Sequence, residues 1–171
     1  MSWIQTYTGK AFYPLREEPG IIDIRDIAHA LSLQCRFNGH CSDFYSVAQH
    51  SVHVSEVVPD AFALWGLLHD AAEAYLTDLP RPVKSHMPQF RDLEDRLLGL
   101  IMAQHQLSMP MPDEVRLADE QMLMTEARDL MEVPPMDWKI PVMPFDDMKI
   151  KPLSPKKAEQ LFLQRYAELT A

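Results

Sequence analysis

Apolar residues recur at helical spacing through five successive segments, and this periodicity restricts the fold of the chain more than any other feature. In the second segment, for example, Val47, Val54 and Val57 share one helix face. The five segments cover approximately residues 22–33, 46–58, 60–76, 89–104 and 113–131. Successive helices bury their apolar faces against one another. The sequence therefore predicts an all-α helical bundle.

The expected helix ends rest on residues with known capping and breaking effects. Asp43 or Ser46 can cap the second helix, and Pro59 stops it. Asp60 can cap a third helix, which we expect to run without interruption to the DLPRP turn at Pro80.

The two ends of the chain differ in composition from this helical core of about residues 22–131. Residues 3–20 alternate in polarity and contain Gly and Pro, which indicates an extended or short-strand arm. Six of the fourteen prolines fall within residues 133–155, so we expect an irregular arm across the surface there. Ser154 and Pro155 then favour a last helix over 156–169. We expect residues 1–171 to form one domain.

Composition and charge narrow the class of protein. There are only two cysteines, no secretion-signal pattern at the start and no apolar run long enough for a membrane span. We therefore expect a reduced, cytoplasmic, soluble protein. The net charge of −9 disfavours binding to a nucleic-acid backbone, which relies on a basic surface. We expect Lys149, Lys151, Lys156 and Lys157 to form a solvated surface.

The stretch LLHDAAEAYLTDLPRPVK, residues 67–84, combines packing residues with acidic ones. His69, Asp70, Glu73 and Asp78 interrupt an apolar segment, and such groups are costly to bury without a partner. On a helix His69 and Glu73 share a face, and Asp70 lies one step around. A bound metal ion would compensate their burial.

Other helices must complete the coordination of such an ion. His50 lies in the apolar stripe of the second helix, where an unpaired imidazole would be poorly satisfied, and Asp119 lies beside the apolar face of the fifth. His53 is a rival to His50. Asp113 and Asp129 compete with Asp119, although Asp113 is better explained as a helix cap. His86 or His105 could supply a second metal, but we expect a single ion.

The order His50, then His69 and Asp70, then Asp119 resembles the H…HD…D signature of HD-domain phosphohydrolases, which are all-α enzymes. SVAQHS (46–51) and HDAAEAYLTDLPRPVK (69–84) are similar to segments of small bacterial deoxyribonucleoside monophosphatases and of related phage deoxynucleoside triphosphohydrolases. The likeness covers approximately residues 22–130. It implies an HD-domain bundle in which His50, His69, Asp70 and Asp119 bind one divalent metal ion.

The same resemblance implies roles for five further residues. A carboxylate at the position of Glu73 orients or deprotonates the attacking water, and Asp78 works beside it. Arg36 and Phe37 take the place of a pair that contacts phosphate and screens the sugar, and Lys84 completes the cationic side of the pocket. Phe37 departs from the family, because the monophosphatases usually have Trp there.

Phosphate-ester hydrolysis suits these residue types. An anionic ester repels hydroxide, so such a site uses a metal to acidify water and cations to neutralise the phosphoryl oxygens. Mixed imidazole and carboxylate ligands suit Mn, Co, Fe, Zn or Ni. Four protein ligands leave open positions if the ion is six-coordinate.

We therefore expect an enzyme that releases phosphate or polyphosphate from a deoxyribonucleotide, either a dNMP or a dNTP, to give the nucleoside. Some relatives suggest a deoxyadenosine nucleotide as the substrate. One rival hypothesis is a catalytically silent nucleotide sensor or signalling adaptor, and another is a purely structural helical protein. Glu73 and Asp78 argue against the sensor, since binding alone needs no water-directing carboxylates. By analogy with relatives we expect a homo-oligomer, with the Pro-rich arm lying across a neighbouring subunit.

Overall fold

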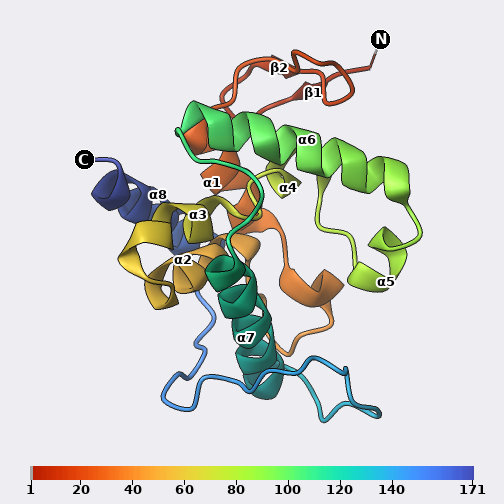
Figure 1. Ribbon diagram of the computed structural model, residues 1–171, viewed down its shortest axis with the longest axis vertical. Coiled ribbons are helices and arrows are strands. Elements are labelled where there is room, and N and C mark those ends of the chain that lie inside the picture. Colours follow the sequence, from red (N-terminus) through yellow and green to blue (C-terminus); the bar gives the residue numbers. More distant parts are fainter. Residues whose placement is uncertain (1) are drawn as a thin grey trace.

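The computed structural model describes residues 2–171, and most of the ordered elements are helices (Figure 1). In chain order the elements are β1 (Ile4–Gln5), β2 (Ala11–Phe12), α1 (Ile24–Leu33), the 3-10 turn η1 (Arg36–Gly39), α2 (Val47–Val57), η2 (Asp60–Phe62), α3 (Ala63–Leu68), α4 (Glu73–Leu76), α5 (Arg81–Lys84), α6 (Pro88–Gln104), α7 (Asp113–Leu130) and α8 (Pro155–Leu169). The expected all-α class is confirmed. The only sheet within these residues is the antiparallel β1–β2 pair.

Helix α2 lies at the centre of the bundle. It contacts α1, α3, α7 and α8, and its residues Val47, Ala48 and Val54 are completely buried. The helices around it contribute buried residues such as Leu31 of α1, Leu67 of α3 and Phe162 of α8. Burial of this apolar surface is the main stabilising contribution to the bundle. A polar residue on the inner face of α2 is therefore held in a nearly water-free position.

The prediction of one continuous third helix is wrong. The segment 60–76 is divided into η2, α3 and α4, with a turn at residues 69–72 between the last two. The His69 ring donates a hydrogen bond of 2.7 Å from Nδ1 to the carbonyl of Gly66, which an α-helix would use for the amide of Asp70. The following amides bond three residues back instead, as Glu73 does to Asp70. This tighter turn sets the directions of His69, Asp70 and Glu73.

Most of the other helix ends follow the sequence. The Ser46 hydroxyl caps α2 and the Ser154 hydroxyl caps α8, each by accepting a backbone N–H. Asp60 and Asp113 do not cap helices, because they stand inside the elements that begin after Pro59 and Pro112. A further short helix, α5, follows Pro80, where we expected only a turn.

The Pro-rich segment is irregular, as predicted, and passes around the C-terminal end of α7 (Figure 1). Its later part is tied to that helix. Asp129 accepts hydrogen bonds from Lys149 Nζ at 2.9 Å and from the Ile150 amide at 2.8 Å, and Arg128 donates to the Phe145 carbonyl at 2.8 Å. Asp129 therefore anchors the arm and does not compete with Asp119 for a metal ion.

Among residues 2–171, no helix combines the length and the apolar character that crossing a bilayer requires.

Candidate metal centre and cleft

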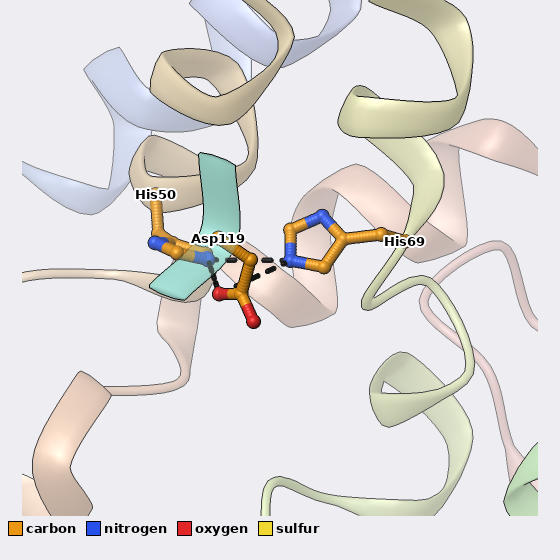
Figure 2. Close-up of side chains that lie close together, drawn as sticks. All are labelled: His50, His69 and Asp119. Carbon is orange, nitrogen blue, oxygen red and sulfur yellow. Dashed lines mark hydrogen bonds and ion pairs between the residues drawn. The ribbon is translucent and has the colours of Figure 1, made fainter. Parts of the chain in front are cut away.

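Three side chains from separate elements converge in the interior of the bundle. His50 comes from α2, His69 follows α3, and Asp119 comes from α7 (Figure 2). The Nε2 atoms of the two histidines lie 3.2 Å apart. Asp119 Oδ1 lies 3.1 Å from His50 Nε2 and 3.8 Å from His69 Nε2. Within the described residues, this is the one group of His, Cys, Asp and Glu close enough to hold a metal ion.

Asp70 extends this group. Its Oδ2 atom lies 3.2 Å from His69 Nε2 and 3.8 Å from His50 Nε2. Ligand atoms that share one ion at bond lengths of about 2.0–2.2 Å lie roughly 3–3.6 Å from one another. His50, His69 and Asp119 therefore lie at nearly the separations that a single ion requires, and Asp70 lies beside both histidines without belonging to that group.

Hydrogen bonding orients both imidazoles toward the same point. His69 Nδ1 faces the Gly66 carbonyl, which can only accept, so this nitrogen carries the hydrogen. His50 Nδ1 lies 2.6 Å from Glu126 Oε1 and donates to that carboxylate. In the neutral rings the lone pairs of both Nε2 atoms then face each other and the two Asp carboxylates. A cation between them would remove this repulsion, so the donor set fits a divalent ion.

The charges in the cluster are strongly coupled. Burial opposes ionisation of His69, but Asp70 and Asp119 outweigh it and raise the pKa of the ring well above its ordinary value. Burial also opposes ionisation of the acids and would raise their pKa values, yet the histidines lower the pKa of Asp70 to about 2 and that of Asp119 well below its usual range. Both acids are therefore ionised at neutral pH. Metal binding would release the proton that the imidazoles hold.

Glu126 supports the cluster, and the sequence analysis missed it. Its fully buried carboxylate accepts hydrogen bonds from His50, from the Tyr45 hydroxyl at 2.8 Å, and from Arg36 Nη2 at 3.0 Å. Burial would raise its pKa, but Arg36 and His50 lower it overall, so the group is ionised. Glu126 stands seven residues after Asp119, two helical turns along the same face of α7. That spacing was the signal available in the sequence.

A cleft of about 950 Å³ opens over the cluster. All the predicted site residues line it except His50 and His69, which are buried. The predicted residues in its wall are Arg36, Phe37, Asp70, Glu73, Asp78, Lys84 and Asp119. The structure thus places the predicted ligands, acids and cations around one space.

Glu73 is the most unusual carboxylate in this wall. Its residue is only 5% exposed, and its Oε2 atom has no hydrogen-bond partner among residues 2–171. Burial and the charges of Asp70 and Asp78 raise its pKa well above the ordinary value. A buried polar atom without a protein partner is rare, and it indicates a position that a water or a ligand would satisfy.

Two of the cations that line the cleft, Arg36 and Lys84, are held by nearby acids. Arg36 Nη1 lies 3.9 Å from Asp70 Oδ2, in addition to its bonds with Glu126. Lys84 Nζ lies 2.8 Å from Glu94 Oε1 and 3.6 Å from Glu73 Oε1. Burial would lower the pKa of Lys84, but the two glutamates raise it. Both cations therefore stay charged at neutral pH.

The alternative histidines lie elsewhere. His53 contacts Gln49 and Glu56, His86 bonds within its own exposed turn, and His105 lies against Tyr166. None of the three belongs to the metal-binding group found among the described residues.

The fold and the cluster define a mostly helical protein with a buried His/Asp group that could hold a metal ion. No family model matches the chain. The protein YfdR of Escherichia coli K12, described as uncharacterized, is 41% identical over 172 residues, which span 99% of this chain and 97% of YfdR. The protein RCAP_rcc00048 of Rhodobacter capsulatus, also described as uncharacterized, is 33% identical over 127 residues, 68% of this chain and 65% of that protein. The chain belongs to the family of YfdR.

Added metal should stabilise the protein through this cluster. At a concentration about 100 times Kd, Mn²⁺, Co²⁺ or Zn²⁺ contributes about 2.7 kcal/mol, because it binds the native state and not the unfolded one. For a chain of this size we expect Tm to rise by about 5–10 °C, measured by differential scanning calorimetry. The variant His50→Ala should lose this increase and His53→Ala should keep it. An equal increase in both variants would contradict the assignment.

Proposed function

We propose that the protein is a metal-dependent phosphohydrolase of the HD-domain type that acts on deoxyribonucleotides. One observation carries this proposal: His50, His69 and Asp119 converge beneath a cleft whose wall also holds Arg36 and Lys84. A cluster for a cation and two fixed positive charges in one cleft suit the binding of a phosphate ester. The resemblance of residues 46–51 and 69–84 to the deoxyribonucleotide phosphohydrolases adds the substrate class.

His50, His69, Asp70 and Asp119 would hold one divalent transition metal, such as Mn, Co, Fe, Zn or Ni. When bound there, it would lower the pKa of a water molecule and neutralise charge on a phosphoryl oxygen. Glu126 keeps the hydrogen of His50 on Nδ1, so that Nε2 is free to face the ion.

Four other charged residues of the cleft have roles in substrate binding and proton transfer in this proposal. Arg36 and Lys84 neutralise the phosphoryl oxygens, and both are held in place by buried or half-buried acids. Glu73 presents its unpartnered Oε2 to the attacking water, orients it and accepts its proton. Asp78 lies in the same wall, where it contacts the sugar or the leaving group. The cleft brings these groups together around one space.

A panel of nucleotides tests the proposal directly. The protein, purified with Mn²⁺ or Co²⁺, should release phosphate or polyphosphate from deoxynucleoside mono-, di- or triphosphates and leave the nucleoside, as followed by chromatography. Nucleotide binding without turnover would instead support a silent sensor. A protein that neither hydrolyses nor binds any member of the panel, with any of the metals, would reject the proposal.

The variant Glu73→Gln should lose most of the activity and keep the fold. General acid–base groups contribute about 10²–10⁴-fold to rate, so kcat should fall by roughly that factor. Its stability should not fall, because the amide keeps the shape of a side chain whose Oε2 bonds to nothing within residues 2–171. Steady-state kinetics and thermal unfolding measure the two effects. Glu114→Gln, at an exposed position at the start of α7, serves as the control.

A further inference from the structure

Trp138 is less exposed than several other large apolar residues of the Pro-rich arm. Val133, Met136 and Met143 are 89%, 78% and 77% exposed, whereas Trp138 is 38% exposed and lines the cleft. Its ring centroid lies 6.3 Å from that of Phe37, with the planes inclined at 47°. Two aromatic rings from distant parts of the sequence thus stand together in the wall of the cleft.

The backbone on both sides holds this pair in place. Phe37 and Asn38 have φ values of +54° and +52°, and Lys139, directly after Trp138, has +56°. Bulky residues rarely adopt this left-handed conformation, and such strain concentrates at binding and catalytic sites. The side chain of Asp137 accepts a hydrogen bond of 2.9 Å from the amide of Lys139, which stabilises the turn that carries Trp138.

The arm is also fixed to α7 beyond this turn. The amide of Phe145 donates to Thr125 Oγ1 at 2.9 Å, and Asp129 binds the backbone at Ile150. Residues 132–144 therefore connect the end of α7 to a fixed point on the same helix (Figure 1). Trp138 stands at the middle of this connection, on the side of the cleft.

The lining of the cleft changes from charged to apolar along α7. Asp119 belongs to the metal-binding group, whereas Leu123, one turn or about 6 Å further on, and Met131 at the helix end are apolar. Ile140 and the two aromatic rings belong to the same lining. A molecule that complements this lining would have an anionic end beside Arg36 and Lys84 and a planar, apolar end near the arm. A volume of about 950 Å³ is in the range of small-molecule sites.

We propose that Trp138 is a substrate-contacting, specificity-determining residue, which with Phe37 forms the wall on which the nucleobase stacks. This inference rests on the proposed function and adds to it the part of the site that selects nucleotides over other phosphate esters. Stacking on an aromatic ring tolerates any base, because every base has a π face. Stacking on Trp138 and Phe37 therefore favours substrates that carry a base, without distinguishing one base from another.

Kinetics of the full-length, metal-loaded protein test the role of Trp138. The substrates are deoxyadenosine monophosphate, a deoxynucleotide with a base, and deoxyribose 5-phosphate, which has the same phosphate and sugar without a base. Trp138→Ala should raise KM for the nucleotide by about 10–100-fold, with kcat changed less than about threefold. KM for deoxyribose 5-phosphate should not change. Trp138→Phe should restore most of the affinity, and Trp3→Ala, at an exposed position outside the cleft lining, should behave as wild type.

Other outcomes overturn the inference. An unchanged KM for the nucleotide, or an equal rise in KM for both substrates, would show that Trp138 does not contact a base. If Trp138→Ala is poorly folded, Trp138→Leu replaces it, and wild-type affinity in that variant would contradict stacking. Quenching of tryptophan fluorescence by deoxyadenosine monophosphate, compared between Trp138→Ala and Trp3→Ala, needs no turnover. This readout therefore tests Trp138 even if the protein hydrolyses nothing, a result that would reject the proposed function alone.

Discussion

Replacing Asp70 by Asn should lower kcat by about 100-fold or more and reduce the bound metal. Asp70 Oδ2 lies 3.2 Å from His69 Nε2, and the amide keeps the shape of the side chain while removing one of the two carboxylates beside the Nε2 atoms of the histidines. Metal-assisted catalysis is worth several kcal/mol, and a loss of about 3 kcal/mol corresponds to roughly 100-fold in rate. Steady-state kinetics and elemental analysis of the purified variant measure the two effects.

This variant also separates the three hypotheses for the protein. In an enzyme both turnover and metal content fall, in a silent sensor only metal and ligand binding fall, and a structural helical protein is nearly indifferent. Asp95→Asn, at an exposed position of α6, removes the same charge outside the cluster and the cleft lining and should behave as wild type. Full activity of Asp70→Asn with a normal metal content would contradict the assignment of this ligand.

Replacing Glu126 by Ala should destabilise the protein by about 3–5 kcal/mol, because it leaves buried cationic partners without their counter-charge. Arg36 loses two hydrogen bonds, and the Tyr45 hydroxyl and the His50 ring lose one each. For a domain of this length the corresponding fall in Tm is about 6–20 °C. Thermal unfolding of the metal-free protein measures it without any contribution from bound metal.

The same residue should matter for metal affinity. Loss of a carboxylate that orients a ligating histidine costs about 10–100-fold in affinity, so Glu126→Gln, which keeps the shape, should bind metal more weakly. Glu120→Ala, on the same helix at a partly exposed position, should change stability by less than about 0.5 kcal/mol. If Glu126→Ala unfolds at the temperature of Glu120→Ala, the buried network has no structural role.

The local sequence pattern was sufficient to predict a helix and its bounds where the helix packs with one face and ends at a strong helix breaker. The expected helices 89–104 and 113–131 correspond to α6 (Pro88–Gln104) and α7 (Asp113–Leu130), since their apolar periodicity is uninterrupted. The segment 60–76 has equal helical periodicity, yet it breaks at His69. The His69 side chain there donates a hydrogen bond to the Gly66 carbonyl, which the backbone amide of an α-helix would otherwise use. Helix propensity and apolar periodicity do not reveal this competition.

The candidate site shows the same division. The sequence suggested His50, His69, Asp70 and Asp119, because polar groups on apolar helix faces need a reason to be buried. It did not single out Glu126, whose role depends on meeting Arg36 and His50 from other elements. Trp138 carried no signal, because it lies in an irregular arm with no periodicity to indicate which side chains turn inward.

The sequence by itself determined the helical class, most helix boundaries and the residue types able to bind a cation, because these follow from periodicity, capping and the chemistry of single side chains. Only the tertiary structure decided which nitrogens of His50 and His69 face each other, that Glu126 stands behind one of them, and that Trp138 reaches the cleft. These features depend on contacts between residues far apart in the chain. Their energies arise only when packing brings the partners together.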